Sequence, residues 1–250
     1  MFRVFGIRLA VHFSFLLLLA YVAWQGWMEA GWAGVVWSVA LIALLFTCVV
    51  LHELGHSLTA RRFGIGVPRI LLLPIGGMAE FDSIPREPRK ELLITLAGPA
   101  VNFAIVLAMW PFVSMPASWA DGELPLTFAG LGWELLLVNL VMGCFNLLPV
   151  FPMDGGRILR ALLATRLTYL RATYWAATIG KVLAVIAGLI AALVFHNYLT
   201  AFLFAFIYAA GEAEYRAVLR RDLEDAHWRA MASQLYPRPP TTEEPPLLGP

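Results

Sequence analysis

Charged residues are scarce in this chain of 250 residues: they make up 14% of it, and 60% of the residues are hydrophobic. In a typical soluble domain about a quarter of the residues are charged. Together with a mean hydropathy of +0.73, this excludes an ordinary soluble enzyme and predicts an integral membrane protein. The net charge is +1, and no basic stretch is interleaved with aromatic residues. The sequence therefore does not indicate nucleic-acid binding.

Cysteine and histidine are also few. Cys48 and Cys144 both lie in apolar stretches, which favours a packing role and gives no support for a disulfide. Five histidines are too few for membrane di-iron enzymes, which need several histidine clusters. Of the five, only His52 and His56 are close in sequence.

Six apolar segments are long enough to cross a bilayer. They cover residues 9–27, 32–61, 90–113, 126–148, 174–195 and 198–219. The first lacks a signal-peptide cleavage site, and no soluble domain is expected before it. The fourth is broken at Pro149 and Pro152, and a short helix is expected at 155–167. The predicted fold is an all-α polytopic membrane protein with six transmembrane helices, a broken fourth helix and a small β-hairpin near the active site.

The basic residues predict the orientation. The connections at 28–31, 114–125 and 196–197 contain none, and all 18 Lys and Arg residues fall on the opposite side of the predicted membrane. By the positive-inside rule, both termini are cytoplasmic. This topology fits a prokaryotic plasma membrane.

The stretch His52-Glu53-Leu54-Gly55-His56 directly follows an uncharged run, Gly34–Leu51, that is long enough to cross a bilayer. On a helix His52 and His56 lie on one face, where they can bind a tetrahedral Zn²⁺ and leave room for a third ligand and a water. Glu53 is placed to accept a proton from that water. Because His56 precedes Arg61 by five residues, the site is expected near the cytoplasmic surface.

Two further stretches bear on this site. Arg69–Asp82 contains two short apolar runs around Pro74–Gly77, which predicts either a β-hairpin able to pair with an extended peptide or an ordinary loop. Asp154 follows two prolines and precedes Gly155, in a break that membrane proteins tolerate where protein or water surrounds it. Asp154 is a better third ligand than His12, His196 or His227, although it could also cap the following helix.

The histidine motif and the proline-containing stretch that ends in Asp154-Gly155 occur together in a known family. His52–His56 followed by Asn146–Gly155 (NLLPVFPMDG) resembles the site-2 protease family of intramembrane zinc metalloproteases. The resemblance covers residues 1–215 and is carried further by His52–Phe63, Leu73–Ala79, Ala97–Asn102 and Asp154–Leu162.

The resemblance implies that His52, His56 and Asp154 bind one Zn²⁺ and that Glu53 is the general base. It also implies that Asn146 and Asn102 lie close to the site and orient substrate or stabilise an oxyanion. For Asn102, a hydrogen bond between helices is an equally good explanation. The implied substrate is a single-span membrane protein, often already cut by another protease, whose transmembrane helix unwinds before a peptide bond within or near it is hydrolysed.

The C-terminal part departs from many compact relatives, which carry two nucleotide-sensing regulatory domains. Residues 210–250 are too few for such a domain. The expected organisation is a protease domain at 1–219, a cytoplasmic helical extension at 220–236, and a proline-rich disordered tail at 237–250.

Two other functions are compatible with parts of this pattern. In a divalent-metal transporter, His52, His56 and Asp154 would form a transit site, but no internal repeat is evident and Glu53 is better explained by hydrolysis. An inactive relative that shelters membrane helices would be expected to lack a ligand or Glu53, and neither is missing. The sequence therefore favours a protease that works in the lipid bilayer, and it makes no prediction of oligomeric state.

Overall fold

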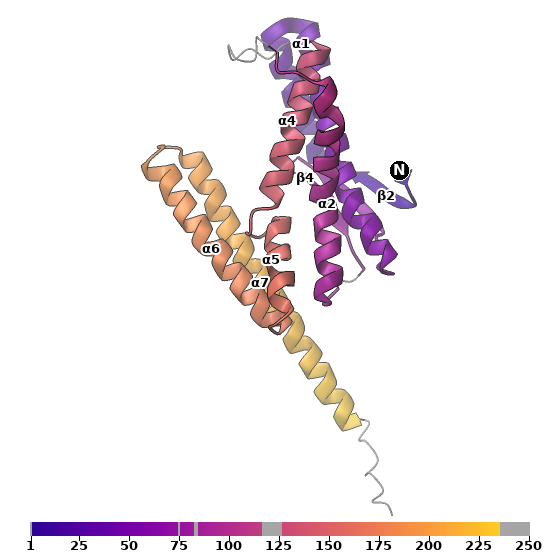
Figure 1. Cartoon of the computed structure of the whole chain (residues 1–250), viewed down its shortest axis with the longest axis vertical. Helices are drawn as coiled ribbons and strands as arrows, with labels where there is room; N and C mark the ends of the chain where they lie inside the picture. The colour runs from indigo at the N-terminus through magenta and orange to yellow at the C-terminus, as the bar shows by residue number, and fades with distance from the viewer. Residues whose placement is uncertain (1, 75, 83–84, 117–126, 236–250) are drawn as a thin grey trace, which may run out of the picture.

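The computed structural model describes residues 2–74, 76–82, 85–116 and 127–235. Within these ranges the chain is mostly helical (Figure 1). The helices are α1 (Phe13–Arg62), α2 (Pro88–Met109), the 3₁₀ turn η1 (Trp110–Phe112), α4 (Phe128–Asn146), α5 (Asp154–Ala164), α6 (Tyr169–Leu193) and α7 (Tyr198–Leu235). The proline-rich tail predicted at 237–250 and the predicted start of the fourth segment at residue 126 lie outside the described residues.

A four-stranded sheet lies beside α1. Its strands are β1 (Phe2–Val4), β2 (Ile7–Val11), β3 (Arg69–Leu73) and β4 (Gly76–Glu80), in the order β1-β2-β3-β4. β3 and β4 form the predicted hairpin, with Leu72 opposite Gly77, while β2 pairs parallel to β3. The chain is mostly helical and contains the predicted hairpin, but the prediction of an all-α fold missed β1 and β2, and the prediction of a first helix that begins at Leu9 was wrong. Leu9 lies in β2, and the helix begins at Phe13.

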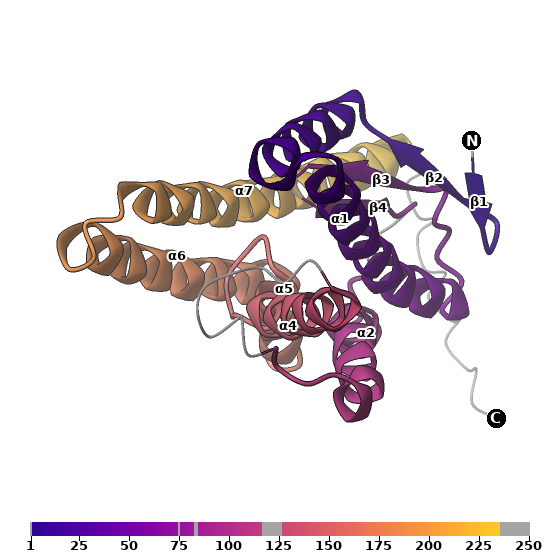
Figure 2. The same ribbon diagram turned by 90° about the horizontal axis from the view of Figure 1, so that it is seen from above.

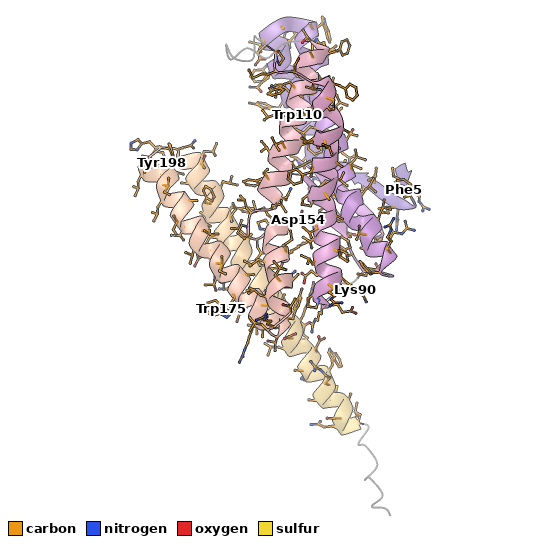
Figure 3. The ribbon with its side chains drawn as sticks, viewed as in Figure 1. Phe5, Lys90, Trp110, Asp154, Trp175 and Tyr198 are labelled. Carbon is orange, nitrogen blue, oxygen red and sulfur yellow. The ribbon has the colours of Figure 1, made fainter. Side chains whose placement is uncertain are left out.

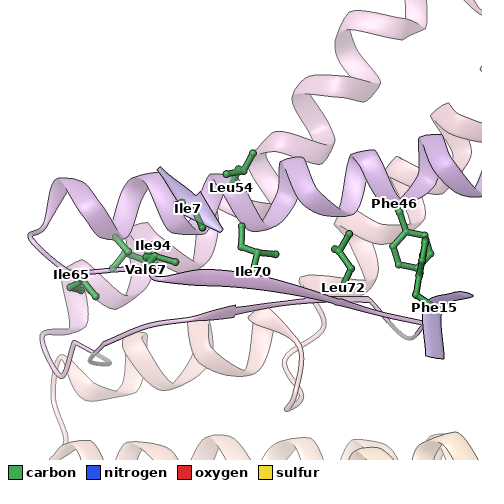
Figure 4. Close-up of a cluster of buried hydrophobic side chains, with 10 residues drawn as sticks. Ile7, Phe15, Phe46, Leu54, Ile65, Val67, Ile70, Leu72 and Ile94 are labelled. Carbon is green, nitrogen blue, oxygen red and sulfur yellow. The ribbon is translucent and has the colours of Figure 1, made fainter. Parts of the chain in front are cut away.

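A core of buried apolar side chains lies between α1 and the sheet (Figure 4). Ile7 and Ile70 are fully buried among the residues that β2, β3 and α1 bring together. His12 then ends the strand and caps α1, because its Nδ1 accepts a hydrogen bond from the backbone N–H of Ser14 (3.2 Å). Only His12 separates Leu9–Val11 of β2 from the apolar residues of α1, so hydropathy alone does not mark where the strand ends and the helix begins.

Helix α1 is interrupted in its first half. Ala30 and Gly31 have non-helical backbone angles, with φ of +60° at Gly31. The chain folds back there and brings Gly34 against Gly26. A Cβ on Gly34 would lie 1.9 Å from the carbonyl oxygen of Gly26. Small residues permit such close approach of helices in membranes. The two helices predicted at 9–27 and 32–61 are therefore the two arms of α1.

Four helical stretches of the described chain are long and apolar enough to cross a membrane: α1, α2 with η1, α4 and α6. The protein is thus an integral, multi-pass membrane protein. α6 and α7 run side by side and diverge from α2 and α4, and α7 extends beyond the other helices (Figures 1 and 2). α6 buries small residues, among them Ala172, Ala176 and Gly180, which let neighbouring backbone approach closely.

A buried ion cluster ties α5 to α2 and α7. Arg160 of α5 is only 1% exposed. Its Nε donates to Glu91 Oε1 on α2 (2.8 Å), and its Nη1 donates to Glu214 Oε1 on α7 (2.6 Å). The guanidinium also lies over the Tyr169 ring, 5.0 Å from its centroid. These contacts fix the position of α5, whose first residue is Asp154, relative to α2.

We expect Arg160→Ala to lower the free energy of unfolding by about 3–5 kcal/mol, because the buried Glu91 carboxylate loses its partner. Thermal unfolding in detergent measures the change. The matched control is Lys90→Ala, which removes an exposed ion pair with Glu87; such pairs contribute less than about 1 kcal/mol. Equal unfolding temperatures for Arg160→Ala and wild type would contradict a structural role for the cluster.

Candidate metal centre

His52 and His56 lie one turn apart on the second arm of α1 and face the same way. Both are buried, with exposures of 5% and 7%. Their Nε2 atoms are 3.1 Å apart, and the ring planes are nearly perpendicular at 84°. The helix therefore brings the two imidazoles to one point, as the spacing in the sequence predicts.

Asp154 reaches the same point from α5. Its Oδ2 lies 3.3 Å from His52 Nε2 and 3.2 Å from His56 Nε2, and the residue is 7% exposed. In Figure 3 Asp154 lies at a level between Trp110 at one end of the helices and Lys90 at the other. Asp154 is the first residue of α5, and the N-cap position belongs to Met153. The alternative role for Asp154, as cap of a helix beginning at Gly155, is therefore not observed.

The other ring nitrogens define which tautomer each histidine adopts. His56 Nδ1 is 2.8 Å from the carbonyl oxygen of Ile94, which can only accept, so Nδ1 carries the proton. His52 Nδ1 is 2.6 Å from Asn102 Oδ1 and donates to it. Both Nε2 atoms are therefore without a proton in the neutral rings and present lone pairs to each other and to Asp154.

Three electron-pair donors, the Nε2 atoms of His52 and His56 and Oδ2 of Asp154, thus converge at one buried point. Asp154 Oδ2 has no hydrogen-bond partner among the described residues, and buried polar atoms without a partner are costly. A cation at their centre would satisfy all three. Two imidazole nitrogens and one carboxylate oxygen form a ligand set typical of catalytic zinc sites, in which a water takes the fourth position. His52, His56 and Asp154 are therefore chemically suited to Zn²⁺.

Helix α2 leaves space for the two rings at Gly98. A Cβ on Gly98 would lie 2.2 Å from His56 Nε2 and 2.8 Å from His52 Nε2. A Cβ on Gly55 would likewise meet the carbonyl oxygen of Ala97 at 2.6 Å. Gly98 and the Ile94 carbonyl are parts of the site that sequence reasoning did not single out. The sequence connects Gly98 with the site only through the family resemblance, which includes Ala97–Asn102.

Glu53 is half-buried and lies against the edge strand of the sheet. A Cβ on Gly77 of β4 would lie 2.7 Å from Glu53 Cγ, so glycine is required for this approach. At the far end of the same strand, Glu80 accepts a hydrogen bond from Arg69 of β3 (2.6 Å), which lowers the pKa of Glu80. The sheet thus places its edge strand β4 next to Glu53.

The two asparagines occupy different positions. Asn102 is fully buried behind His52, and both ends of its amide are engaged, since its Nδ2 donates to Asn139 Oδ1 (3.0 Å). Asn146 ends α4 and donates from Nδ2 to the carbonyl oxygen of Met142 (3.0 Å). The structure thus brings Asn102 against a histidine, whereas the hydrogen bond described for Asn146 stays within its own helix.

A cavity of about 50 Å³ adjoins His56. Its lining includes His56, Glu91, Thr95, Arg157 and Arg160. A water molecule needs about 10–15 Å³ of such volume and a few polar partners, both of which this cavity offers. The cavity therefore places room for water beside His56, toward the ion cluster of α2 and α5.

Gly98→Ala is expected to abolish tight zinc binding, because the added methyl group occupies the space of both imidazoles. Zinc per chain, measured by elemental analysis after dialysis, tests this. Gly132→Ala on α4 is the matched control, since its nearest contact would be an ordinary 3.4 Å. Zinc retained at the wild-type level in Gly98→Ala would show that the rings do not need this space.

Comparisons with known proteins agree with this geometry. The chain matches the family model described as Peptidase family M50 over residues 40–127 and 126–187. It is 42% identical over 218 residues to a zinc metalloprotease of Methanocaldococcus jannaschii, a match that covers 87% of this chain and 60% of the relative. It is 32% identical over 227 residues to Rip3 of Mycobacterium tuberculosis, covering 85% and 57% of the two chains.

Among solved structures, the chain is similar to the site-2 protease from Methanocaldococcus jannaschii. The TM-score is 0.60 at 39% identity, and the match covers 86% of this chain and 94% of that one. The two relatives described above are longer, and this chain spans about 60% of their length. The family match, which includes most of the second arm of α1 and all of α5, and the shared fold lead to one conclusion: the chain belongs to peptidase family M50, the site-2 protease family.

Proposed function

We propose that this protein is an intramembrane zinc metalloendopeptidase that hydrolyses a peptide bond within or near the transmembrane helix of a membrane-anchored substrate. The observation that carries the proposal is the convergence of three buried, unprotonated ligand atoms beside a glutamate. Family membership supports the same activity. A site that only held a metal for structure would have no need of Glu53 next to the first histidine.

The proposed roles follow from the positions of the side chains. His52, His56 and Asp154 would hold the zinc ion, as the H-E-x-x-H pattern predicts for the two histidines. When bound, zinc lowers the pKa of a water ligand toward about 7 and polarises a carbonyl group. Glu53 accepts the proton of the attacking water and passes it to the leaving amine. The cavity beside His56 has room for water close to this step.

The proposed substrate is a single-span membrane protein, already shortened by another protease in some cases. An extended peptide could add to the edge of β4, next to Glu53, through backbone hydrogen bonds. We assign substrate contact to Asn146, which ends α4 near the loop that leads to Asp154. Asn102 is better explained as a partner of His52, because both ends of its amide are already engaged.

We also propose the topology expected from the sequence: six spans, with the two arms of α1 counted separately and α4 ending at the break before α5. Both termini would lie in the cytoplasm of a prokaryotic cell, with the active site near that side. Residues 1–219 would form the protease domain and 220–236 a cytoplasmic extension of α7, followed by the tail at 237–250. Arg86, which pairs with Asp222 and Asp225, would hold this extension against the segment before α2.

Glu53→Gln is expected to keep about one zinc per chain and to lose at least 100-fold in cleavage, because the amide cannot accept the proton. Zinc content and cleavage of a panel of single-span substrates are measured on the same purified sample. Glu87→Gln, at an exposed position, is the control. Wild-type turnover in Glu53→Gln would rule out its role as the base.

Metal removal gives a second check of the same proposal. A chelator is expected to abolish cleavage, and added zinc to restore it. If the wild-type protein binds zinc, cuts no substrate and carries zinc into sealed vesicles, the protease proposal is wrong and transport takes its place.

The topology predicts where a reporter can function. A fluorescent protein that matures only in the cytoplasm should be bright when fused after residue 250 and dark when inserted between residues 196 and 197. The reverse pattern would contradict the proposed orientation.

A further inference from the structure

A row of buried polar groups continues from the metal centre into the apolar helices. Behind Asn102 of α2 lies Asn139 of α4, and behind Asn139 lies Cys48 of α1. Asn102 and Asn139 are fully buried, and Cys48 is 4% exposed. Amides are expensive in the interior of a membrane protein, so two in contact at one level call for an explanation.

The direction of each hydrogen bond in this row follows from the partners of Asn139, the residue of the two asparagines that lies farther from the metal centre. Asn139 Nδ2 is 2.8 Å from the backbone carbonyl oxygen of Leu135, which can only accept. It also lies 3.2 Å from Cys48 Sγ, a weak acceptor. The NH₂ group of Asn139 must therefore face these two atoms, and its Oδ1 must face Asn102.

The same reasoning then applies one residue closer to the metal centre. Asn139 Oδ1 accepts from Asn102 Nδ2 at 3.0 Å. Asn102 consequently turns its Oδ1 toward His52 Nδ1, 2.6 Å away. His52 has to donate from Nδ1, which leaves its Nε2 without a proton and pointed at Asp154.

We propose that Asn139 is a positioning residue for the metal centre: acting through Asn102, it selects the tautomer of His52 that can bind a metal. We call the hydrogen-bonded series Asn139–Asn102–His52 the relay. His56 needs no relay of this kind, because the carbonyl of Ile94 already defines its tautomer. The inference rests on the proposed role of His52 as a zinc ligand. It adds a residue that hydrogen-bonds to Asn102, Cys48 and the Leu135 carbonyl rather than to a proposed metal ligand.

The relay is needed because an amide has two ends of similar shape. Without Asn139, Asn102 can rotate by half a turn and present its NH₂ group to His52. His52 Nδ1 would then accept, the proton would move to Nε2, and the nitrogen that faces Asp154 would no longer have a lone pair for a metal. Partners of metal-bound histidines typically contribute 10–100-fold to metal affinity.

Asn139→Leu tests the proposal, since it keeps the approximate size of the side chain and removes its oxygen. We expect zinc affinity, measured by competition with a chelating dye, to fall about tenfold. ¹⁵N NMR of the zinc-free protein should show the His52 proton shifting partly from Nδ1 to Nε2. Asn139→Ala provides the same readouts if the leucine variant gives too little folded protein.

Two comparisons separate positioning from a general loss of stability. In an Asn102→Ala background, Asn139→Leu should cause no further loss of zinc affinity, because the relay is already broken. Thr173→Val is the matched control: Thr173 is fully buried on α6 and bonds to the Tyr169 carbonyl, outside the relay. It should leave both the zinc affinity and the His52 tautomer unchanged.

The experiments distinguish a failure of the relay from a failure of the proposed function. If folded Asn139→Leu protein has the wild-type His52 tautomer and zinc affinity, or if its effect adds fully to that of Asn102→Ala, the relay is wrong while the metal centre stands. If the wild-type protein itself does not bind zinc, the proposed function is wrong. The His52 tautomer in the zinc-free protein still tests the relay in that case.

Discussion

The rest of the structure depends on three lone pairs that face one another in an apolar interior. His52 Nε2, His56 Nε2 and Asp154 Oδ2 lie within 3.1–3.3 Å of one another, and in the tautomers described above no proton lies between them. In water such an arrangement would be tolerated, but among membrane helices it is costly unless a cation fills it. The helices around it are arranged to keep these atoms together, and a metal would offset that cost.

Holding the atoms together requires three helices from distant parts of the chain. α1 supplies both histidines, α2 approaches closely enough to need Gly98, and α5 carries Asp154. The ion cluster around Arg160 joins α5 to α2 six residues beyond Asp154, so the ligand from α5 meets the histidines at a defined height. Because packing between membrane helices gains little from the hydrophobic effect, small residues and buried polar contacts of this kind determine the arrangement.

Much of this could be predicted from the sequence, because the strongest signals are local. The spacing of His52 and His56 and the proline-glycine break around Asp154 indicated a shared metal site, and hydropathy indicated the helices. β2 could not be found, because Leu9–Val11 read as the start of an apolar helix, and a strand pairing with β3 depends on residues about 60 positions away. Asn139 was missed for a similar reason, since a lone amide in an apolar segment does not reveal which residue it faces.

The polar groups of the site also differ in how their orientation is determined. A backbone carbonyl can only accept, so Ile94 determines the tautomer of His56 by itself. A side-chain amide can turn either way, so the partner of His52 needs support of its own, which comes from Asn139 and finally from the Leu135 carbonyl. Each chain of hydrogen bonds therefore ends at a backbone carbonyl within a helix. Because both carbonyls belong to helices that pack around the site, the fold and the tautomers of both histidines are determined together.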